Sequence, residues 1–351
     1  MPEIEKLVAA FEDPAVVELM INDDGSVYVE KGGPRLQLLD ARVGPQDALA
    51  FVRGVVGAAE EFGPLRPYAD LSATDGSRVH VLAPPLAKGL TVTVRKRPGR
   101  RPGLGQLAQA NALSKGCAGF LDYCVRQKMN LLIVGGTSSG KTTLLSALCG
   151  RLGPDERILV LEDTPELTLP QSHVLYLRTR LRDAAGLPDV TLRELMINVL
   201  RMRPDRVIVG ETRGPEAADM LQAMNVGQDG MMTTLHANSA REAVARLETL
   251  VLQAGMDMPL KAVRQNIVSA VDFIVFMARL ADGSRRVVQV SEITGLEVET
   301  VSMADLFTMD LRRGPGGLEA RLRPTGAMPR FYDRLRRQGV EPPLEFFRGD
   351  S

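Results

Sequence analysis

The chain has 351 residues, of which 44% are apolar, enough for packed cores in about two domains. Its 43 basic and 43 acidic residues balance, whereas proteins that bind nucleic acid over a large surface usually carry a basic excess, so no nucleic-acid partner is expected. The three cysteines, Cys117, Cys124 and Cys149, form no C-x-x-C pair, which excludes a disulfide framework and a structural zinc site.

Neither a signal peptide nor a transmembrane segment is predicted. Residues 1–20 carry acidic charge throughout and lack the basic start of a signal peptide. The most apolar later run, residues 267–281, is interrupted by Asp272 and is shorter than the ~20 residues that a spanning helix needs. We therefore expect a cytoplasmic protein.

Residues 1–94 are predicted to form a small α+β domain. Residues 13–33 suggest two strands joined by an Asp-Asp-Gly turn, and residues 44–63 place apolar side chains at helical spacing. A basic segment rich in proline and glycine follows at residues 95–106 and indicates a linker.

Residues 107–300 alternate predicted helices with short apolar strands. The runs NLLIVGG, RILVLED and DRVIVGE are typical of a parallel sheet that helices cover on both faces. Residues 301–351 return to short, charged pieces punctuated by proline, for which we expect a peripheral cap. The predicted class is therefore α/β, with a smaller N-terminal α+β domain.

A phosphate-binding loop is predicted at residues 135–142. Their sequence, GGTSSGKT, matches the pattern G-x-x-x-x-G-K-[ST] in full, between an apolar strand and a helix. The glycines let backbone N–H groups point at phosphate, the Lys141 ammonium reaches the β- and γ-oxygens, and the Thr142 hydroxyl binds Mg²⁺. We expect ATP and Mg²⁺ as ligands, held by Gly135, Gly136, Thr137, Ser138, Ser139, Gly140, Lys141, Thr142 and Thr143.

A candidate catalytic base follows the apolar run at residues 207–209. Glu211 lies at the carboxyl end of this predicted strand, where ligands bind in open α/β sheets. A carboxylate there can take the proton of the attacking water. The general Walker B pattern ends in aspartate, and Gly210 takes that place, so Glu211 alone would serve. The alternative is an ordinary surface glutamate.

Another predicted strand ends in a group of acids, Glu162, Asp163 and Glu166. Like charges at one strand end repel each other unless a cation or an arginine lies among them. We expect Mg²⁺ bound through water, which makes Asp163 a candidate metal ligand beside Thr142. The alternative is a solvated turn opened by residues 164–165.

His236, one of only three histidines, follows the apolar run MMTTL. At the end of a central strand its imidazole could hydrogen-bond a γ-phosphate oxygen and report the loss of that group. The alternative is a hydrogen-bonded structural residue.

The basic run Arg95-Lys96-Arg97, with Arg100 and Arg101, contains no aromatic residue, so no stacking platform for nucleic acid is indicated. Arginine near a triphosphate has a better-defined use, because its planar donor fork stabilises charge on the transferred phosphoryl group and can come from another subunit. The alternative is a solvated linker.

The chain lacks the N-K-x-D stretch of GTPases and the L-S-G-G-Q signature of ABC transporters, which leaves a RecA-like P-loop ATPase. The motifs GGTSSGKTT, LEDTPEL, RMRPDRVIVGETRGPEA and GQDGMMTTLHANSAREAVARLE, in this order, resemble the secretion-ATPase superfamily of type II and type IV secretion and type IV pili. The tail, EITGLE followed by PTGAMPRFYDRLRRQGVEPPLEFF, is most similar to the CpaF/TadA type that drives Flp (tight-adherence) pili. The tetracysteine zinc motif of the PilB-like branch is absent.

The resemblance implies roles for the candidate residues. Residues 135–142 would be Walker A, Glu211 the Walker B glutamate and His236 part of the His box. Glu162, Asp163 and Glu166 would form the Asp box. Arg95 and Arg97 fall where the family places arginines that reach nucleotide, often across a subunit boundary.

The expected function is a homohexameric ATPase motor, peripheral at the inner membrane, that acts on platform proteins of a Flp pilus or a related secretion system. Lys141, Glu211, Glu162, His236, Arg95 and Arg97 are the expected catalytic residues. The rival interpretations are a nucleic-acid translocase of related fold and a regulator that binds ATP without hydrolysing it.

Overall fold

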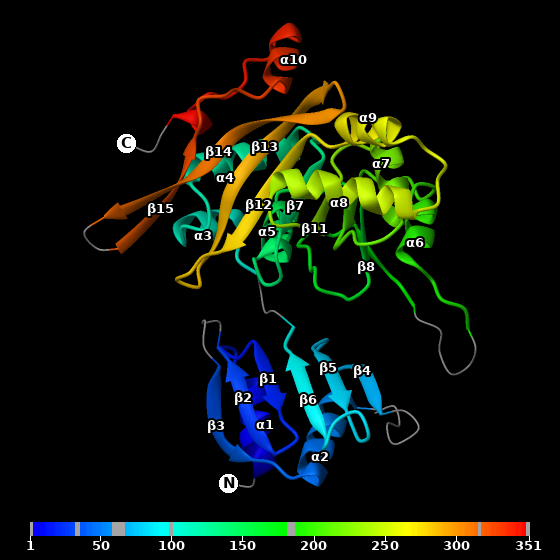
Figure 1. Ribbon diagram of the computed structural model, residues 1–351, viewed down its shortest axis with the longest axis vertical. Helices are drawn as coiled ribbons and strands as arrows, with labels where there is room; N and C mark the ends of the chain where they lie inside the picture. Colours follow the sequence, from blue (N-terminus) through cyan, green and yellow to red (C-terminus); the bar gives the residue numbers. More distant parts are fainter. Residues whose placement is uncertain are drawn as a thin grey trace. The chain divides into compact units, whose positions relative to one another are not determined.

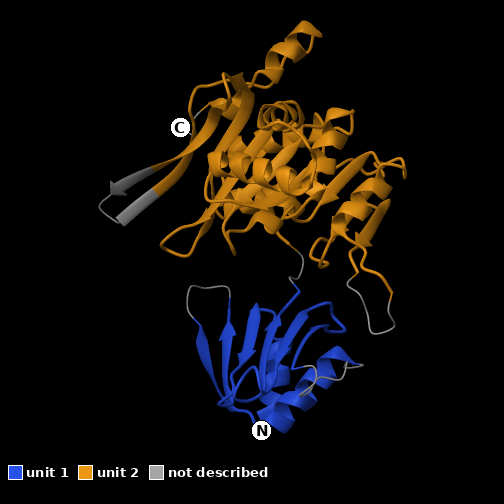
Figure 2. Ribbon diagram, turned by 45° about the vertical axis from the view of Figure 1, so that its right-hand side comes forward, with its two compact units in different colours: residues 1–100 blue, residues 101–351 orange. Residues whose placement is uncertain are grey.

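The computed structural model describes residues 3–31, 36–57, 67–97, 101–180, 187–314 and 317–348. Two compact units divide the chain, Met1–Arg100 and Arg101–Ser351 (Figure 2). Each unit has its own sheet and its own buried core, and each is described separately below.

The described part of the first unit is a six-stranded antiparallel sheet, with the strand order β3-β2-β1-β6-β5-β4, together with helices α1 and α2 (Figure 1). Strand residues alternate between buried and accessible, so one face of the sheet packs against the helices. The elements are α1 (Glu3–Glu12), β1 (Glu18–Ile21), β2 (Ser26–Glu30), β3 (Gln37–Arg42), α2 (Pro45–Val56), β4 (Tyr68–Ser72), β5 (Arg78–Leu82) and β6 (Thr91–Arg95).

Strand β6 extends into the segment that we expected to be linker. Arg95 lies opposite both Glu18 and Arg78, because β6 pairs with β1 on one side and β5 on the other. The next helix, α3 (Leu104–Gln109), already belongs to the second unit. The segment between β6 and α3, residues 96–103, is therefore shorter than the predicted linker at residues 95–106.

The second unit is built on a nine-stranded sheet with the order β15-β14-β13-β12-β7-β11-β10-β8-β9. Its strands are parallel from β12 to β9 and antiparallel from β12 to β15. They are β7 (Leu131–Gly135), β8 (Ile158–Glu162), β9 (Val174–Arg178), β10 (Arg206–Val209), β11 (Met232–His236), β12 (Phe273–Arg279), β13 (Arg285–Glu297), β14 (Thr300–Gly314) and β15 (Gly317–Pro324). The predicted α/β class is confirmed.

Helices cover both faces of this sheet (Figure 1). Along β7, Leu131 and Ile133 join a core with α4 and α5, while Leu132 and Val134 join a second core with α6 to α9. A strand buried on both faces needs an uninterrupted apolar run, which β7 has. The helices are α4 (Lys115–Arg126), α5 (Lys141–Cys149), α6 (Leu192–Val199), α7 (Glu216–Asn225), α8 (Ala240–Gln253), α9 (Leu260–Ala270) and α10 (Phe331–Arg337), with a 3-10 turn at Glu345–Phe347.

The C-terminal segment, for which we expected a peripheral cap, contains the long antiparallel strands β14 and β15. Beyond them, Phe331 of α10 and Phe347 pack on Phe120 of α4, with ring centroids 6.4 and 5.3 Å apart. Aromatic rings and strand pairing thus attach the described parts of residues 301–348 to the core of the second unit.

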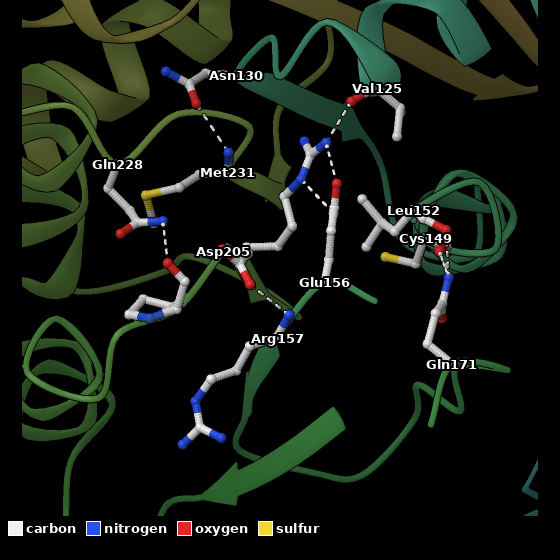
Figure 3. A network of polar contacts seen from close by, with 12 residues as sticks. Val125, Asn130, Cys149, Leu152, Glu156, Arg157, Gln171, Asp205, Gln228 and Met231 are labelled. Atoms are coloured by element: carbon white, nitrogen blue, oxygen red, sulfur yellow. Dashed lines mark hydrogen bonds and ion pairs between the residues drawn. The ribbon is translucent and has the colours of Figure 1, made fainter. Parts of the chain in front are cut away.

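At the edge of the sheet where the parallel strands begin, polar groups are tied into a network (Figure 3). Arg206, at the start of β10, is 2% exposed and donates to Glu156 Oε2 at 2.7 Å and to the Val125 carbonyl at 2.9 Å. The Asn130 side chain accepts the Met231 N–H at 2.9 Å. These contacts join the amino ends of neighbouring strands to one another and to the carboxyl end of α4.

Candidate functional site

The predicted phosphate-binding loop links β7 to α5. Positive φ angles at Ser138 (57°) and Gly140 (98°) curl the loop, and a Cβ on Gly135 would come within 2.5 Å of Ser139 Oγ. Lys141, the first residue of α5, is 7% exposed, and its Nζ donates to the Gly135 and Gly136 carbonyls at 3.0 and 2.8 Å. Backbone N–H groups at a helix start together with an ammonium group make a cradle for phosphate, so the loop fits a nucleotide.

The candidate residues gather because β7, β11, β10 and β8 are parallel neighbours and end at one edge of the sheet. Gly135 pairs in register with His236, the last residue of β11. Glu162 ends β8, and Glu211 follows β10. Residues that lie far apart in sequence therefore converge beside the phosphate loop.

The Glu211 and His236 side chains contact each other at this edge. The His236 Nε2 lies 2.9 Å from Glu211 Oε1, and the two side chains are 48% and 31% exposed. Burial lowers the pKa of His236, the positive charge of Lys141 lowers it further, and Glu211 opposes both effects. Both the Lys141 ammonium and the Glu211 carboxylate therefore lie close enough to the His236 imidazole to influence its pKa. Where we expected His236 to contact phosphate, its partner in the structure is the candidate base.

Glu162 is more buried than a solvated turn would make it, at 5% exposure. One carboxylate oxygen accepts the N–H groups of Glu166 and Leu167, both at 3.0 Å. Burial, the largest cause, raises the pKa of Glu162 to about 6. A Cβ on Gly210 would lie 2.9 Å from Glu162 Cγ, so the glycine that departs from the Walker B pattern makes room for this carboxylate.

Two arginines lie among the acids that follow β8. Arg213 contacts Asp163, and the Nη2 of Arg101 lies 3.2 Å from Glu166 Oε2. The positive charges of these arginines offset the repulsion among the carboxylates, a role for which we expected Mg²⁺. Within the described residues, no group of three or more His, Cys, Asp or Glu side chains is placed to hold a metal. Thr142, in the first turn of α5, stays the predicted magnesium ligand.

Arg95 and Arg97 lie in the first unit. The Nε of Arg95 is 3.7 Å from Glu18 Oε1, and the backbone N–H of Arg97 donates to Ser77 Oγ at 2.9 Å. The arginines that do contact the acids after β8 are Arg101 and Arg213, and the sequence analysis did not identify them as neighbours of Glu166 and Asp163. The available signals were the basic run that ends at Arg101 and the position of Arg213 two residues after the candidate base.

A shallow cavity of about 560 Å³ lies elsewhere in the second unit, between α3, α4 and the end of α5. None of the predicted site residues lines it, and its walls include Gly103, Gln106, Gly119 and Arg151. The chemistry of the strand edge, rather than the size of a hollow, identifies the candidate site.

No helix in the described ranges combines the length and the apolarity needed to cross a bilayer. Comparison with known proteins gives a consistent family. The model of the family described as type II/IV secretion system protein matches residues 72–305. A putative conjugal transfer protein of Mycobacterium tuberculosis is 32% identical over 303 residues, which cover 84% of this chain and 84% of that protein.

The conjugal transfer protein TrbB of Rhizobium radiobacter is 33% identical over 296 residues, covering 83% of this chain and 88% of TrbB. Among solved structures, the ATPase DotB of Yersinia pseudotuberculosis matches with a TM-score of 0.61 at 16% identity, over 83% of this chain and 79% of that one. The structural likeness confirms the predicted RecA-like core. The chain belongs to the type II/IV secretion system protein family and is a P-loop ATPase of that family.

Proposed function

We propose that this chain is a motor that uses ATP hydrolysis to drive a type II/IV secretion machine. The observation that carries the proposal is the meeting of the phosphate loop, with Lys141, and the Glu211–His236 pair at one edge of a parallel sheet. Ligands of open α/β sheets bind at that edge. Membership of the secretion family supports mechanical work on a secretion system as the use of the energy.

Each side chain has a distinct part in the proposed hydrolysis. The N–H groups of the loop and the Lys141 ammonium bind the phosphates, and Glu211 takes the proton of the attacking water. His236 orients the Glu211 carboxylate through their 2.9 Å contact. The Thr142 hydroxyl would hold Mg²⁺, which would neutralise charge on the β- and γ-phosphates. Glu162, which packs against Gly210, would supply a second carboxylate close to Glu211.

The proposed assembly is a homohexameric ring at the cytoplasmic side of the inner membrane, held there by platform proteins. Arg95 and Arg97 would supply positive charge to the nucleotide of a neighbouring subunit, which the planar guanidinium fork suits. Turnover would then move the first unit against the second and transmit force to the platform.

The machine that the motor serves has two candidates. The residues 292–297 and 324–347 favour a Flp pilus of the CpaF/TadA type. The relatives named conjugal transfer proteins, which match over most of the chain, favour a conjugal transfer system. Hydrolysis rates of the purified chain with platform proteins of either system, added separately, decide between them.

Replacing Glu211 with Gln tests the proposal itself. The amide keeps the shape of the side chain but cannot take a proton, so kcat should fall roughly 10²-fold or more while ATP binding is retained. The matched control is Glu248→Gln, which alters a carboxylate paired with Arg264 between α8 and α9. Wild-type turnover in Glu211→Gln would contradict the assigned base. Mass measurement with a non-hydrolysable ATP analogue tests the hexamer.

The same protein separates the rival interpretations. A nucleic-acid translocase would hydrolyse ATP faster when DNA is added, with a steep salt dependence. A regulator that only binds ATP would keep its full activity in the Glu211→Gln variant. The proposed motor responds to platform proteins and not to DNA.

A further inference from the structure

Arg101 is the first residue of the second unit, and its side chain is 9% exposed. Its Nη2 donates to Glu166 Oε2 at 3.2 Å, across 65 residues of sequence. Its positive charge also reaches Glu162, because it opposes the rise that burial causes in the pKa of that carboxyl. The point where the chain enters the second unit therefore touches the acidic loop after β8.

That loop leads directly to the proposed base. The N–H groups of Glu166 and Leu167 hold the Glu162 carboxylate at 3.0 Å. Glu162 in turn packs on Gly210, where no Cβ could fit without a shift, and Glu211 is the next residue. Three contacts thus connect the Arg101 guanidinium to the residue that would activate water.

A contribution to stability does not account for this arginine well. Arg206, which is similarly buried, donates to both oxygens of Glu156 and to a carbonyl. Arg101 has one carboxylate contact, and its buried Nη1 has no hydrogen-bond partner among the described residues, a feature that Arg206 shares. Burying a charge with a single contact recovers little of its desolvation cost. The Arg101–Glu166 contact is then better explained by the position in which it holds Glu166 than by its contribution to stability.

We propose that Arg101 is a positioning residue for ATP hydrolysis: through Glu166 it fixes the loop that holds Glu162 against Gly210, beside Glu211. The inference rests on the proposed function, because it assigns a partner to the same catalytic carboxylates. It also means that a displacement of the chain at Arg101 alters the site, which links the entry point of the second unit to hydrolysis.

A double-mutant cycle on the full chain tests the pair. Arg101→Ala and Glu166→Ala should each lower kcat roughly tenfold, because partners that orient catalytic ligands typically matter on this scale. The KM for ATP should change by less than about twofold, since the pair does not touch the nucleotide. The double variant should be no slower than either single one, because both remove the same contact. The charge swap Arg101→Glu with Glu166→Arg should restore most of the rate.

The matched control is Arg264→Ala, which breaks a partly buried ion pair with Glu248 at 2.8 Å away from the site and should leave kcat unchanged. Wild-type kcat in Arg101→Ala, or losses that multiply in the double variant, would overturn the inference. If Arg101→Ala fails to fold, Arg101→Lys and Glu166→Gln carry the same test. If the wild type hydrolyses ATP and Glu211→Gln does not, a failure here concerns Arg101 alone and leaves the proposed function standing.

Discussion

Polar side chains at the amino ends of the parallel strands differ in burial and bonding from those at the carboxyl ends. At the edge where the parallel strands begin, Arg206 is 2% exposed and makes three hydrogen bonds to Glu156 and Val125. At the edge where they end, Glu211 and His236 are 31% and 48% exposed, with one contact between them. The Arg206 guanidinium at the first edge is buried and bonded to neighbouring segments, whereas Glu211 and His236 at the second edge stay accessible to a ligand. One sheet therefore separates stability from chemistry.

This comparison predicts two kinds of variant. Changes at the first edge should alter the free energy of unfolding and leave kcat per folded molecule intact. Changes at the second edge should alter kcat and leave stability nearly intact or improve it. A variant that mixes the two effects would break the division.

Lys141→Ala should give the largest effect. Loss of the ammonium removes the charge that we propose binds the β- and γ-phosphates, so kcat should fall roughly 10³-fold and ATP binding should be lost. The two hydrogen bonds from Nζ to loop carbonyls are worth about 1 kcal/mol each, which is small beside the stability of a domain, so the chain should still fold. Coupled hydrolysis assays and nucleotide titration measure both. Lys115→Ala is the matched control, because Lys115 also opens a helix but follows no glycine loop. Unchanged turnover in Lys141→Ala would refute the phosphate loop.

Arg206→Leu should have the next largest effect, on the free energy of unfolding rather than on kcat. It leaves Glu156 without its guanidinium, and breaking such a buried pair costs about 3 kcal/mol of unfolding free energy. Urea unfolding of the full chain gives the loss, and kcat per folded molecule should match the wild type. Arg336→Leu is the control, because its exposed pair with Asp333 contributes roughly 0.5 kcal/mol or less. A fall in kcat that exceeds the loss of folded protein would show that the first edge also serves the chemistry.

Local sequence was sufficient to predict the phosphate loop and the parallel sheet. The turn at Gly140 needs a positive φ that glycine supplies at no cost, and an apolar run such as β7 must be buried on both faces. Because parallel strands end at one edge, placing a motif at each strand end also predicted that these motifs would lie near one another, although the direct contact between Glu211 and His236 was not predicted.

The partners of the acids after β8 could not be predicted in the same way. The contacts Arg101–Glu166 and Arg213–Asp163 join residues 65 and 50 positions apart, and no local pattern says which arginine reaches which carboxylate. The burial of Glu162 depends on Gly210, a neighbour in space that follows another strand, β10. The strands β14 and β15 were missed because charged residues interrupt their apolar runs, and the prolines between and after them suggested short peripheral pieces.

Glu162→Gln should have the smallest effect of these variants. It is informative because it should change kcat and the free energy of unfolding in opposite senses. Burial raises the pKa of the Glu162 carboxyl from 4.5 to about 6, so the folded state binds its proton more tightly than the unfolded state does. Unfolding then releases a proton between these pH values, and the ionised carboxylate costs up to about 2 kcal/mol of stability above them. The amide oxygen can still accept the N–H groups of Glu166 and Leu167.

The Glu162→Gln variant should therefore be as stable as the wild type near pH 4 and up to about 2 kcal/mol more stable near pH 8, while its kcat falls. Urea unfolding across this range, without nucleotide or Mg²⁺, gives the difference curve. Glu194→Gln is a control of opposite sign, because the N–H and hydroxyl of Thr191 lower the pKa of Glu194, so its stabilising effect is present at high pH and lost as pH falls. A flat difference curve for Glu162→Gln would mean that the carboxylate is solvated at neutral pH. Gain of stability with loss of turnover would instead show that this edge keeps a charge buried because hydrolysis requires it.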